Sequence, residues 1–201
     1  MAAAAPLPSK QPSQSAVERK LIDLTQLKAA NVPIFFIVGR PGSGKGTQCE
    51  KIVAKYGDLL RRLFIRMSSM TIVLDLIKEA MVKAVEDKKC KGFLIDGYPR
   101  EVQQGIDFER EIQPSKLVFY FDVTNEKTLI ERLLKRAQTS GRVDDNLETI
   151  SKRLLTIKTA TAPVVDHYKN SGKLARIEAD GTVDAIFVEV CKHIDKALSQ
   201  K

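Results

Sequence analysis

Residues 39–47 read Gly39-Arg40-Pro41-Gly42-Ser43-Gly44-Lys45-Gly46-Thr47. The apolar run Ile34–Val38 precedes this stretch, and the helix-compatible segment Gln48–Tyr56 follows it. Glycine tolerates backbone angles that turn successive N–H groups toward one point, so a glycine-rich turn at the start of a helix can hold a chain of phosphates. The stretch therefore predicts a strand, a phosphate-binding turn and a helix, in which Lys45 supplies a charge for the terminal phosphates.

The spacing of this turn fits the P-loop pattern, with one departure. Most P-loops have Ser or Thr directly after the lysine, whereas this chain has Gly46 there and Thr47 one position later. A glycine-rich turn with a lysine could be an ordinary tight turn. The strand before it and the helix after it favour phosphate binding.

Length and composition predict one globular domain. The chain has 201 residues, 43% of them hydrophobic and 29% charged, and a net charge of +8. This length can bury one sizeable core. Lysines and arginines are scattered, with no basic run between aromatic residues, so the excess predicts attraction for small polyanions or a solvated basic surface, with nucleic acid ranked below both.

Other features of the sequence bear on its compartment. Three widely spaced cysteines, Cys49, Cys90 and Cys191, form no Cys-x-x-Cys pair, which favours a reducing compartment without structural zinc. No apolar run approaches the roughly 20 residues that span a bilayer. We therefore expect a cytoplasmic protein with no membrane partner, in which residues 1–16 are a disordered tail and residues 17–201 form the domain.

Strand and helix patterns alternate along the chain. The expected strands are Ile34–Val38, Phe93–Ile95, Leu117–Phe121 and Leu174–Ile177. The expected helices are Val17–Ala30, Gln48–Tyr56, Thr71–Glu86, Glu101–Glu111, Glu126–Gln138, Asn146–Ser171 and Val183–Leu198, the sixth being bent or interrupted near Pro163. Such alternation predicts an α/β fold, in which helices cover both faces of a parallel sheet and ligands bind at the carboxyl ends of its strands.

A second candidate cluster, Asp96-Gly97-Tyr98-Pro99-Arg100, follows the strand Phe93–Ile95. An aspartate at the end of a buried strand can hold Mg²⁺ through water, and an arginine just beyond it can bind a phosphate through two parallel hydrogen bonds. Asp96 taken alone could equally be a turn or helix-cap residue. Its place in a chain with a P-loop favours the magnesium interpretation.

A third cluster consists of Arg132, Arg136, Arg142 and Arg153. The first two lie four positions apart on one helix face, and Thr139-Ser140-Gly141 is expected to end that helix. An arginine on a mobile loop can close over transferring phosphoryl oxygens and exclude water. We expect Arg132 to be a solvated surface charge and the other three arginines to contact phosphate.

Three ordered motifs resemble the short-lid adenylate kinases of the animal cytosolic type. They are Gly-x-Pro-Gly-Ser-Gly-Lys-Gly-Thr-Gln at 39–48, Asp-Gly-Tyr-Pro-Arg-Glu-Val-Gln-Gln at 96–104 and Ser-Gly-Arg-Val-Asp-Asp-Asn at 140–146. The resemblance covers about Pro33 to the C-terminus, apart from one segment. It implies a three-layer P-loop nucleoside monophosphate kinase fold, a short lid at about residues 135–145, and transfer of the terminal phosphoryl group of Mg-ATP to AMP without a covalent intermediate.

The resemblance also implies a role for each matching residue. ATP would contact Gly42, Ser43, Gly44, Lys45, Gly46, Thr47, Arg136 and, at its adenine, the backbone of Gly181. AMP would contact Gly97, Tyr98, Pro99, Arg100 and Gln104. Arg142 and Arg153 would bridge AMP and the transferring phosphate, so Lys45, Arg136, Arg142 and Arg153 would form the catalytic set, and Asp96 would hold Mg²⁺ through water.

The segment at about residues 57–72 departs from the family. Family members have a strand ending in Ser-Thr or Ser-Ser, then Gly-Asp-Leu-Leu-Arg, then a helical insertion that closes over AMP, and this chain is shorter by on the order of twenty residues. In one alignment Gly57–Arg61 matches the second of these motifs, Arg61 contacts the AMP phosphate and the strand is lost. In the other, Leu63–Ser69 replaces the strand, Ser68-Ser69 face AMP and the insertion is gone. Residue identity favours the first alignment, and the hazard of an uncovered strand edge favours the second.

The sequence therefore predicts an adenylate kinase, expected to be a monomer, that uses ATP, AMP and Mg²⁺ and binds no nucleic acid. A UMP/CMP kinase shares the P-loop and lid pattern, but Tyr98 and Gln103-Gln104 favour AMP. The remaining alternative is an ATP-binding variant with impaired phosphotransfer, because the shortened segment removes closure elements that exclude water. Arg40 also departs from the family, which commonly has a small residue there; its cation either affects the loop or points into solvent.

Overall fold

The computed structural model describes residues 21–57, 59–64, 70–86, 90–140 and 147–199. Its elements, in chain order, are α1 (Thr25–Ala30), β1 (Ile34–Gly39), α2 (Lys45–Tyr56), β2 (Arg61–Phe64), α3 (Met70–Glu86), β3 (Phe93–Asp96), α4 (Val102–Glu111), β4 (Leu117–Asp122), α5 (Glu126–Ser140), α6 (Leu147–Asn170), β5 (Leu174–Glu178) and α7 (Val183–Ser199). Five parallel strands form the middle layer in the order β2-β3-β1-β4-β5. The expected α/β fold with a central parallel sheet is confirmed.

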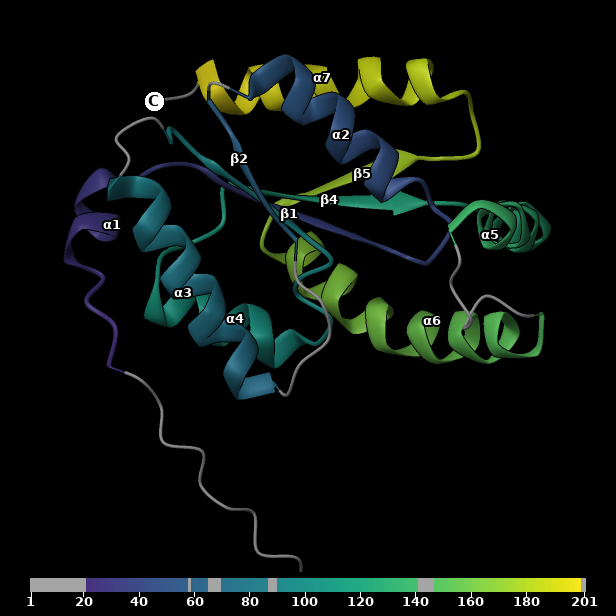
Figure 1. Ribbon diagram of the computed structural model, residues 1–201, viewed down its shortest axis with the longest axis horizontal. Helices are drawn as coiled ribbons and strands as arrows, with labels where there is room; N and C mark the ends of the chain where they lie inside the picture. The colour runs from purple at the N-terminus through teal and green to yellow at the C-terminus, as the bar shows by residue number, and fades with distance from the viewer. Residues whose placement is uncertain (1–20, 58, 65–69, 87–89, 141–146, 200–201) are drawn as a thin grey trace, which may run out of the picture.

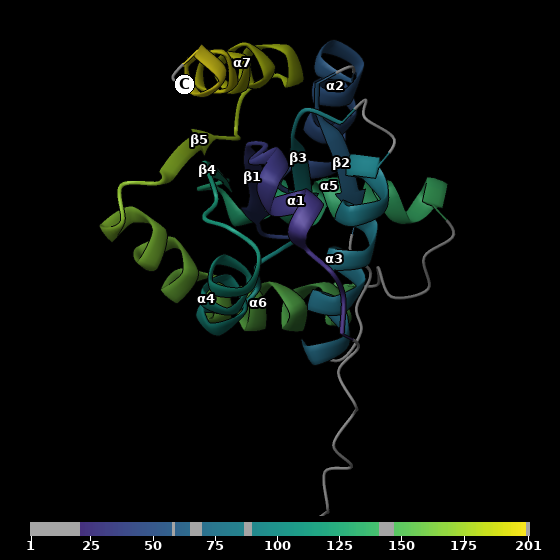
Figure 2. The same ribbon diagram turned by 90° about the vertical axis from the view of Figure 1, so that its left-hand side faces the viewer.

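Helices cover both faces of this sheet. Helices α2 and α7 lie on one face, and α3, α4 and α6 lie on the other (Figures 1 and 2). Among the described helices, none is long and apolar enough to cross a membrane.

The central strand β1 is buried from both sides because its residues alternate between two apolar clusters. Ile34, Phe36 and Val38 pack with side chains of α1, α3, α4 and α6, whereas Phe35 and Ile37 pack with side chains of α2, α5 and α7. A parallel strand between two helical layers needs apolar residues at every position. This explains why the run before the glycine-rich turn is continuously apolar.

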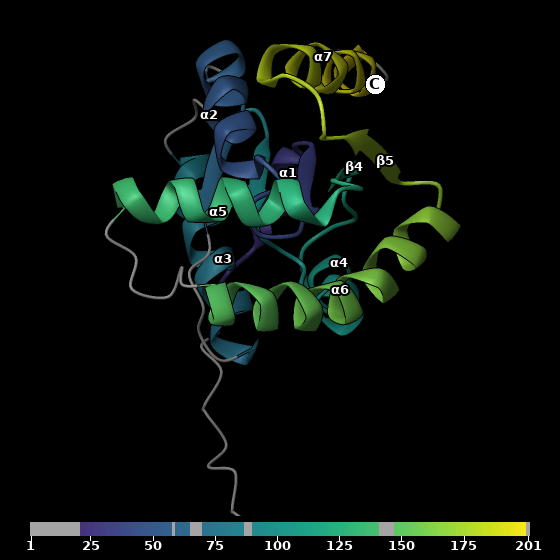
Figure 3. The ribbon, with the colours of Figure 1, turned by 90° about the vertical axis from the view of Figure 1, so that its right-hand side faces the viewer.

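The register of the sheet brings separate parts of the sequence to one edge. Ile37 lies beside Asp96, and Gly39 lies beside Phe121. The turn after β1 and the ends of β3 and β4 therefore meet at the carboxyl edge of the sheet. Helix α5 lies across this edge, in front of the strands in Figure 3.

Strand β2 decides between the two alignments of the shortened segment. It pairs in parallel with β3 at the edge of the sheet, with Arg62 beside Leu94 and Phe64 beside Asp96. The loss of this strand, which the first alignment required, is wrong. The strand begins two residues before the expected Leu63–Ser69, and Ser68 and Ser69 lie outside the described residues. It covers an edge of β3, all four residues of which are buried.

The first helix differs from the expectation. Helix α1 begins only at Thr25, whose N–H is bonded to Asp23 Oδ1 at 2.9 Å, and not at Val17. Of the three leucines that suggested a longer amphipathic helix, Leu27 is buried whereas Leu21 is fully exposed. Residues 17–20 and the expected tail at 1–16 lie outside the described residues.

Two further helices also differ. Helix α6 continues through Pro163, so of the expected bend or interruption the interruption is wrong. Val164 and Tyr168, just beyond the proline, are fully buried and hold the helix in place. Helix α5 continues to Ser140, so the first part of the expected lid, residues 135–140, is helical. Residues 141–146 of that lid lie outside the described residues.

Phe36 lies at the centre of the aromatic core beside β1. Its ring contacts those of Phe108, Tyr98 and Tyr168, with centroids 4.9, 5.7 and 6.1 Å away. We expect Phe36→Ala to lower the free energy of unfolding by about 3–5 kcal/mol, because it leaves a cavity among buried rings. Denaturant unfolding measures this loss. Leu155→Ala is the control, since Leu155 is 67% exposed; equal losses in the two variants would contradict the assignment of this core.

Candidate active site at the carboxyl edge

The turn between β1 and α2 has the backbone conformation of a phosphate-binding loop. Gly42 and Gly44 have φ angles of +80° and +85°, which glycine adopts without strain. A Cβ atom on Gly42 would lie 2.9 Å from the carbonyl oxygen of Leu129, so this residue must be glycine for the turn to pack against α5. A Cβ atom on Gly44 or Gly46 would meet nothing within 4 Å, so the loop is open there to a ligand.

Lys45 is the first residue of α2, and its ammonium group folds back over the turn. Its Nζ donates hydrogen bonds to the carbonyl groups of Gly39 and Arg40 at 2.7 and 2.8 Å. Ser43, beneath the turn, is 1% exposed, whereas Thr47 is exposed. The turn thus holds a cation at its centre.

The electrostatic environment of Lys45 shows which charges surround it. Burial lowers the pKa of Lys45 to about 8; the negative charge of Asp96 opposes this shift, and the positive charges of Arg100 and Arg136 add to it. Such effects need proximity. The structure therefore brings together four residues that the sequence predicted for the site.

Asp96 forms an ion pair with Arg62, a residue that the sequence analysis did not assign. Arg62 Nη2 donates to Asp96 Oδ2 at 2.7 Å, and the two side chains are 23% and 4% exposed. The pairing depends on β2, because only the register of that strand beside β3 brings the guanidinium group to the carboxyl edge. The sequence carried one signal for this role, the consecutive arginines Arg61 and Arg62. Neighbouring side chains in a strand point to opposite faces of the sheet, so the two arginines have different surroundings.

The donor set at this edge is compatible with Mg²⁺ on one condition. Mg²⁺ usually keeps several waters and binds one or two carboxylates together with phosphate oxygens, so a single carboxylate such as Asp96 is a sufficient protein contact. One oxygen of that carboxylate is held by Arg62. Asp96 therefore fits the ion if it can share or leave the guanidinium group.

The turn after β3 and the start of α4 carry the five residues expected at AMP from the motif at 96–104. Gln104 Oε1 accepts a hydrogen bond from the backbone N–H of Arg100 at 2.8 Å, and Arg100 Nε donates to the carbonyl group of Gly97 at 3.2 Å. The Arg100 side chain is exposed. These bonds fix the turn and leave the cation at its surface.

Tyr98 and Pro99 lie differently from what an AMP contact would suggest. Tyr98 is 2% exposed, and its hydroxyl donates to the backbone carbonyl of Gln104 at 2.6 Å. Pro99 is buried as well. Both side chains support the turn from inside, so the expected contact with AMP is limited to their main chain.

Arg40 is part of the fold and not a solvated charge. It is 9% exposed, and its Nη2 donates to the backbone carbonyl of Val123, just after β4. It also lines a cavity of about 250 Å³ with Tyr120 and Asp122. The expectation that Arg40 could point into solvent is wrong, because the end of β4 lies close enough to accept its guanidinium group.

Arg132 also contradicts the expectation of a solvated charge. Its Nη1 donates to the backbone carbonyl of Ala179 at 2.9 Å. The next residue, Asp180, accepts hydrogen bonds at 2.9 Å from the N–H and the hydroxyl of Thr124, and these bonds lower its pKa. Both contacts anchor the turn that carries Gly181, the residue expected at the adenine.

Three predicted residues remain: Arg61, Arg142 and Arg153. Arg61 is the first residue of β2, beside Phe93, which places it at the amino end of the strand. Ligands of a parallel sheet bind at the carboxyl edge, so the expected AMP contact of Arg61 does not fit. Arg142 lies outside the described residues, as does the side chain of Arg153, whose backbone belongs to α6.

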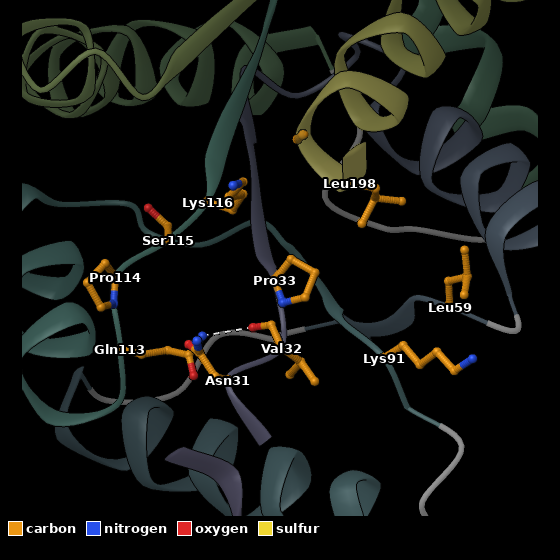
Figure 4. Close-up of a pocket in the computed structure, with 11 residues that line it drawn as sticks. Asn31, Val32, Pro33, Leu59, Lys91, Gln113, Pro114, Ser115, Lys116 and Leu198 are labelled. Carbon is orange, nitrogen blue, oxygen red and sulfur yellow. Dashed lines mark hydrogen bonds between the residues drawn. The ribbon is translucent and has the colours of Figure 1, made fainter. Parts of the chain in front are cut away.

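A cavity of about 930 Å³ lies at the opposite edge of the sheet (Figure 4). Its lining includes Pro33 just before β1, Lys116 just before β4 and Lys91 shortly before β3. Gln113 Nε2 donates to the Val32 carbonyl across it at 2.8 Å. None of the residues predicted to bind nucleotide lines this cavity, so it is separate from the P-loop site.

Comparison with known proteins agrees with the geometry. A family model described as adenylate kinase matches residues 64–173. Adenylate kinase isoenzyme 1 of Caenorhabditis elegans is 60% identical over 207 residues, covering 92% of this chain and 98% of the relative. The chain belongs to the adenylate kinase family.

Vertebrate members of this family are also similar. Adenylate kinase isoenzyme 1 of Homo sapiens is 48% identical over 191 residues, covering 84% of this chain and 97% of the relative. The alignment with the nematode adenylate kinase, at 207 residues, is longer than this chain of 201 residues, so that relative has residues that this chain lacks. This agrees with the expectation that the chain is shorter than its family.

The altered pKa of Lys45 predicts how nucleotide affinity depends on pH. In the ligand-free protein the ammonium group loses its proton as pH rises through about 8, and only the charged form attracts phosphates. We expect the dissociation constant for ATP to rise above pH 8, by at most about tenfold per pH unit. Isothermal titration calorimetry between pH 7 and 10 measures this dependence.

Two variants serve as controls for this dependence. Lys45→Met should bind ATP about 10²–10³-fold more weakly at pH 7 and show no such pH dependence. Lys45→Arg keeps its charge over the whole range, so its affinity should not change near pH 8. A wild-type affinity that stays constant to pH 10 would contradict the role of this ammonium group.

Proposed function

We propose that this chain transfers the terminal phosphoryl group of Mg-ATP to AMP, giving two ADP, and so serves adenine nucleotide homeostasis. The observation that carries the proposal is the P-loop turn, open at Gly44 and Gly46, with Lys45 folded over it and Asp96 at the same edge of the sheet. Phosphoryl transfer needs little covalent chemistry from a protein and depends on positioning and on stabilising charge. The relatives named as adenylate kinases support the choice of substrates.

At the ATP end, the described residues can position the donor. Backbone N–H groups of Gly42–Thr47 bind the phosphates, and Lys45 exchanges its two carbonyl partners for phosphate oxygens. Arg132 holds the turn at Ala179, which keeps the backbone of Gly181 in place for the adenine. Mg²⁺, held through water by Asp96, would neutralise charge on the transferring phosphate.

At the AMP end, the turn after β3 holds the acceptor. Arg100 offers an exposed guanidinium group for the AMP phosphate, with Gln104 fixing its backbone and Gly97 beside it. Arg142 and Arg153 act from the lid and α6 on the phosphate in transit, where they stabilise charge and exclude water. The expected lid at about residues 135–145 includes the last residues of α5, and its closure would bring Arg142 to the transferring phosphate.

The proposal also includes a compartment, an oligomeric state and a metal requirement. We propose a cytoplasmic monomer that needs Mg²⁺. The free thiols of Cys49, Cys90 and Cys191 fit a reducing compartment, where disulfides are rare. The sheet is complete within one chain, and no site residue described above needs a second copy.

The proposal predicts substrate preference and a specific defect. Measured by ADP formation, AMP should be phosphorylated in preference to CMP and UMP, because the motif at 96–104 is the AMP type. Only residues 57–69 lie between α2 and α3, and four of them form β2, so the shortened segment leaves little chain to cover AMP. Inserting the family-length segment between Gly57 and Thr71 should lower KM for AMP and raise kcat together, by on the order of 10²-fold in kcat/KM, because it restores closure.

The ATP end provides the control for this experiment. The insertion should leave the dissociation constant for ATP unchanged, since the P-loop and the Gly181 turn lie outside the altered segment. A lengthened protein no faster with AMP than the parent would show that closure is already sufficient. ATP binding without ADP formation in either protein would instead support the alternative of an ATP-binding variant without phosphotransfer.

A further inference from the structure

We propose that Arg62 competes with the divalent cation for Asp96, so that metal binding in this chain requires the guanidinium group to yield. This inference deepens the proposed function and rests on it. Arg62 thereby acts as a positioning residue through Asp96, and it sets the Mg²⁺ concentration at which ATP binds as its metal complex.

The contact places the two cations on the same carboxylate. Arg62 Nη2 lies 2.7 Å from Asp96 Oδ2, which is within charge-assisted hydrogen-bonding distance. The Asp96 side chain is 4% exposed, so water does little to screen the pair. A metal-bound water that approaches this carboxylate meets an oxygen that is already occupied and a positive charge beside it.

The guanidinium group is held in this position by its surroundings. Its Cζ lies 5.7 Å from the centre of the Phe64 ring, within the range of a cation–π interaction. The register of β2 fixes both residues, since Arg62 pairs with Leu94 and Phe64 pairs with Asp96. Arg62 Nε is buried and has no hydrogen-bond partner among the described residues. Because this donor is buried, the side chain must move before Nε can meet another acceptor.

The opposite edge strand provides a matched comparison. Arg176 on β5 pairs with Tyr120 in register and donates to Asp122, two residues further along β4, with Nε–Oδ2 at 2.9 Å. Arg62 reaches Asp96 across β2 and β3 with the same offset of two residues. The two pairs differ in what lies next to them: Asp96 ends β3 beside Ile37 of β1, and its negative charge raises the pKa of Lys45, whereas Asp122 ends β4 and lines a cavity with Arg40 and Tyr120. The Arg62 pair is therefore the one placed to affect a nucleotide-bound metal.

Calorimetric titration of ATP over a series of Mg²⁺ concentrations tests this competition, with electron paramagnetic resonance of Mn²⁺ in the ATP complex as a direct measure of the metal. In Arg62→Met, the Mg²⁺ concentration for half-maximal enhancement of ATP affinity should fall about tenfold, and Mn²⁺ should bind correspondingly more tightly. Arg62→Lys keeps a cation near Asp96 but loosens the ion pair, so its midpoint should fall measurably but less than that of Arg62→Met. Arg176→Met removes the matched pair and should leave the metal dependence unchanged.

The controls separate this inference from the proposed function and from loss of fold. Circular dichroism and metal-free ATP binding identify the folded fraction of each variant. If Arg62→Met unfolds, Arg62→Lys is compared with the parent instead, because loosening the ion pair should still lower the Mg²⁺ midpoint measurably. An unchanged or raised midpoint in the folded Arg62 variants, with ATP still bound, would overturn the competition alone. A parent that binds no ATP at any Mg²⁺ concentration would overturn the proposed function and this inference together.

Discussion

The parallel pairing of β1 with β3 and β4 is the constraint on which the site depends. Because β1 is buried on both faces and hydrogen-bonded on both sides, the position at which it ends is fixed by a large part of the core. The glycine-rich turn starts there, and the same register brings Asp96 to the level of Ile37. The phosphate site is thus a consequence of strand register, to which the loop chemistry is added.

Features with a local cause could be predicted from the sequence, and features with a tertiary cause could not. Apolar runs and glycine spacing predicted β1, the P-loop and its helix, because each depends on neighbouring residues. Arg132 was expected to be solvated, and Arg40 either to affect the loop or to point into solvent, because their partners, backbone carbonyls at Val123 and Ala179, lie far away in sequence. The same holds for Arg62, whose pairing with Asp96 follows from the position of β2.

The shortened segment shows which part of the fold is indispensable and which part can be lost. A strand remains beside β3, although its residues are at least partly exposed and include two arginines. Covering the edge of β3 outweighs a poor strand sequence, since unpaired strand edges invite aggregation. The flap that the family resemblance implies has no such role in the core, so we propose that its shortening affects the acceptor site while the ATP end keeps its contacts. This asymmetry between the two ends is the central claim about the protein.

Separate calorimetric titrations with Mg-ATP and with AMP, made in parallel on this chain and on the lengthened version with a family-length segment, test that asymmetry most directly. The account predicts ATP dissociation constants within about threefold of each other, and AMP binding to this chain weaker by at least about tenfold, which corresponds to 1.4 kcal/mol. Equal AMP affinity in the two proteins, or a comparable loss of ATP affinity in this chain, would contradict it.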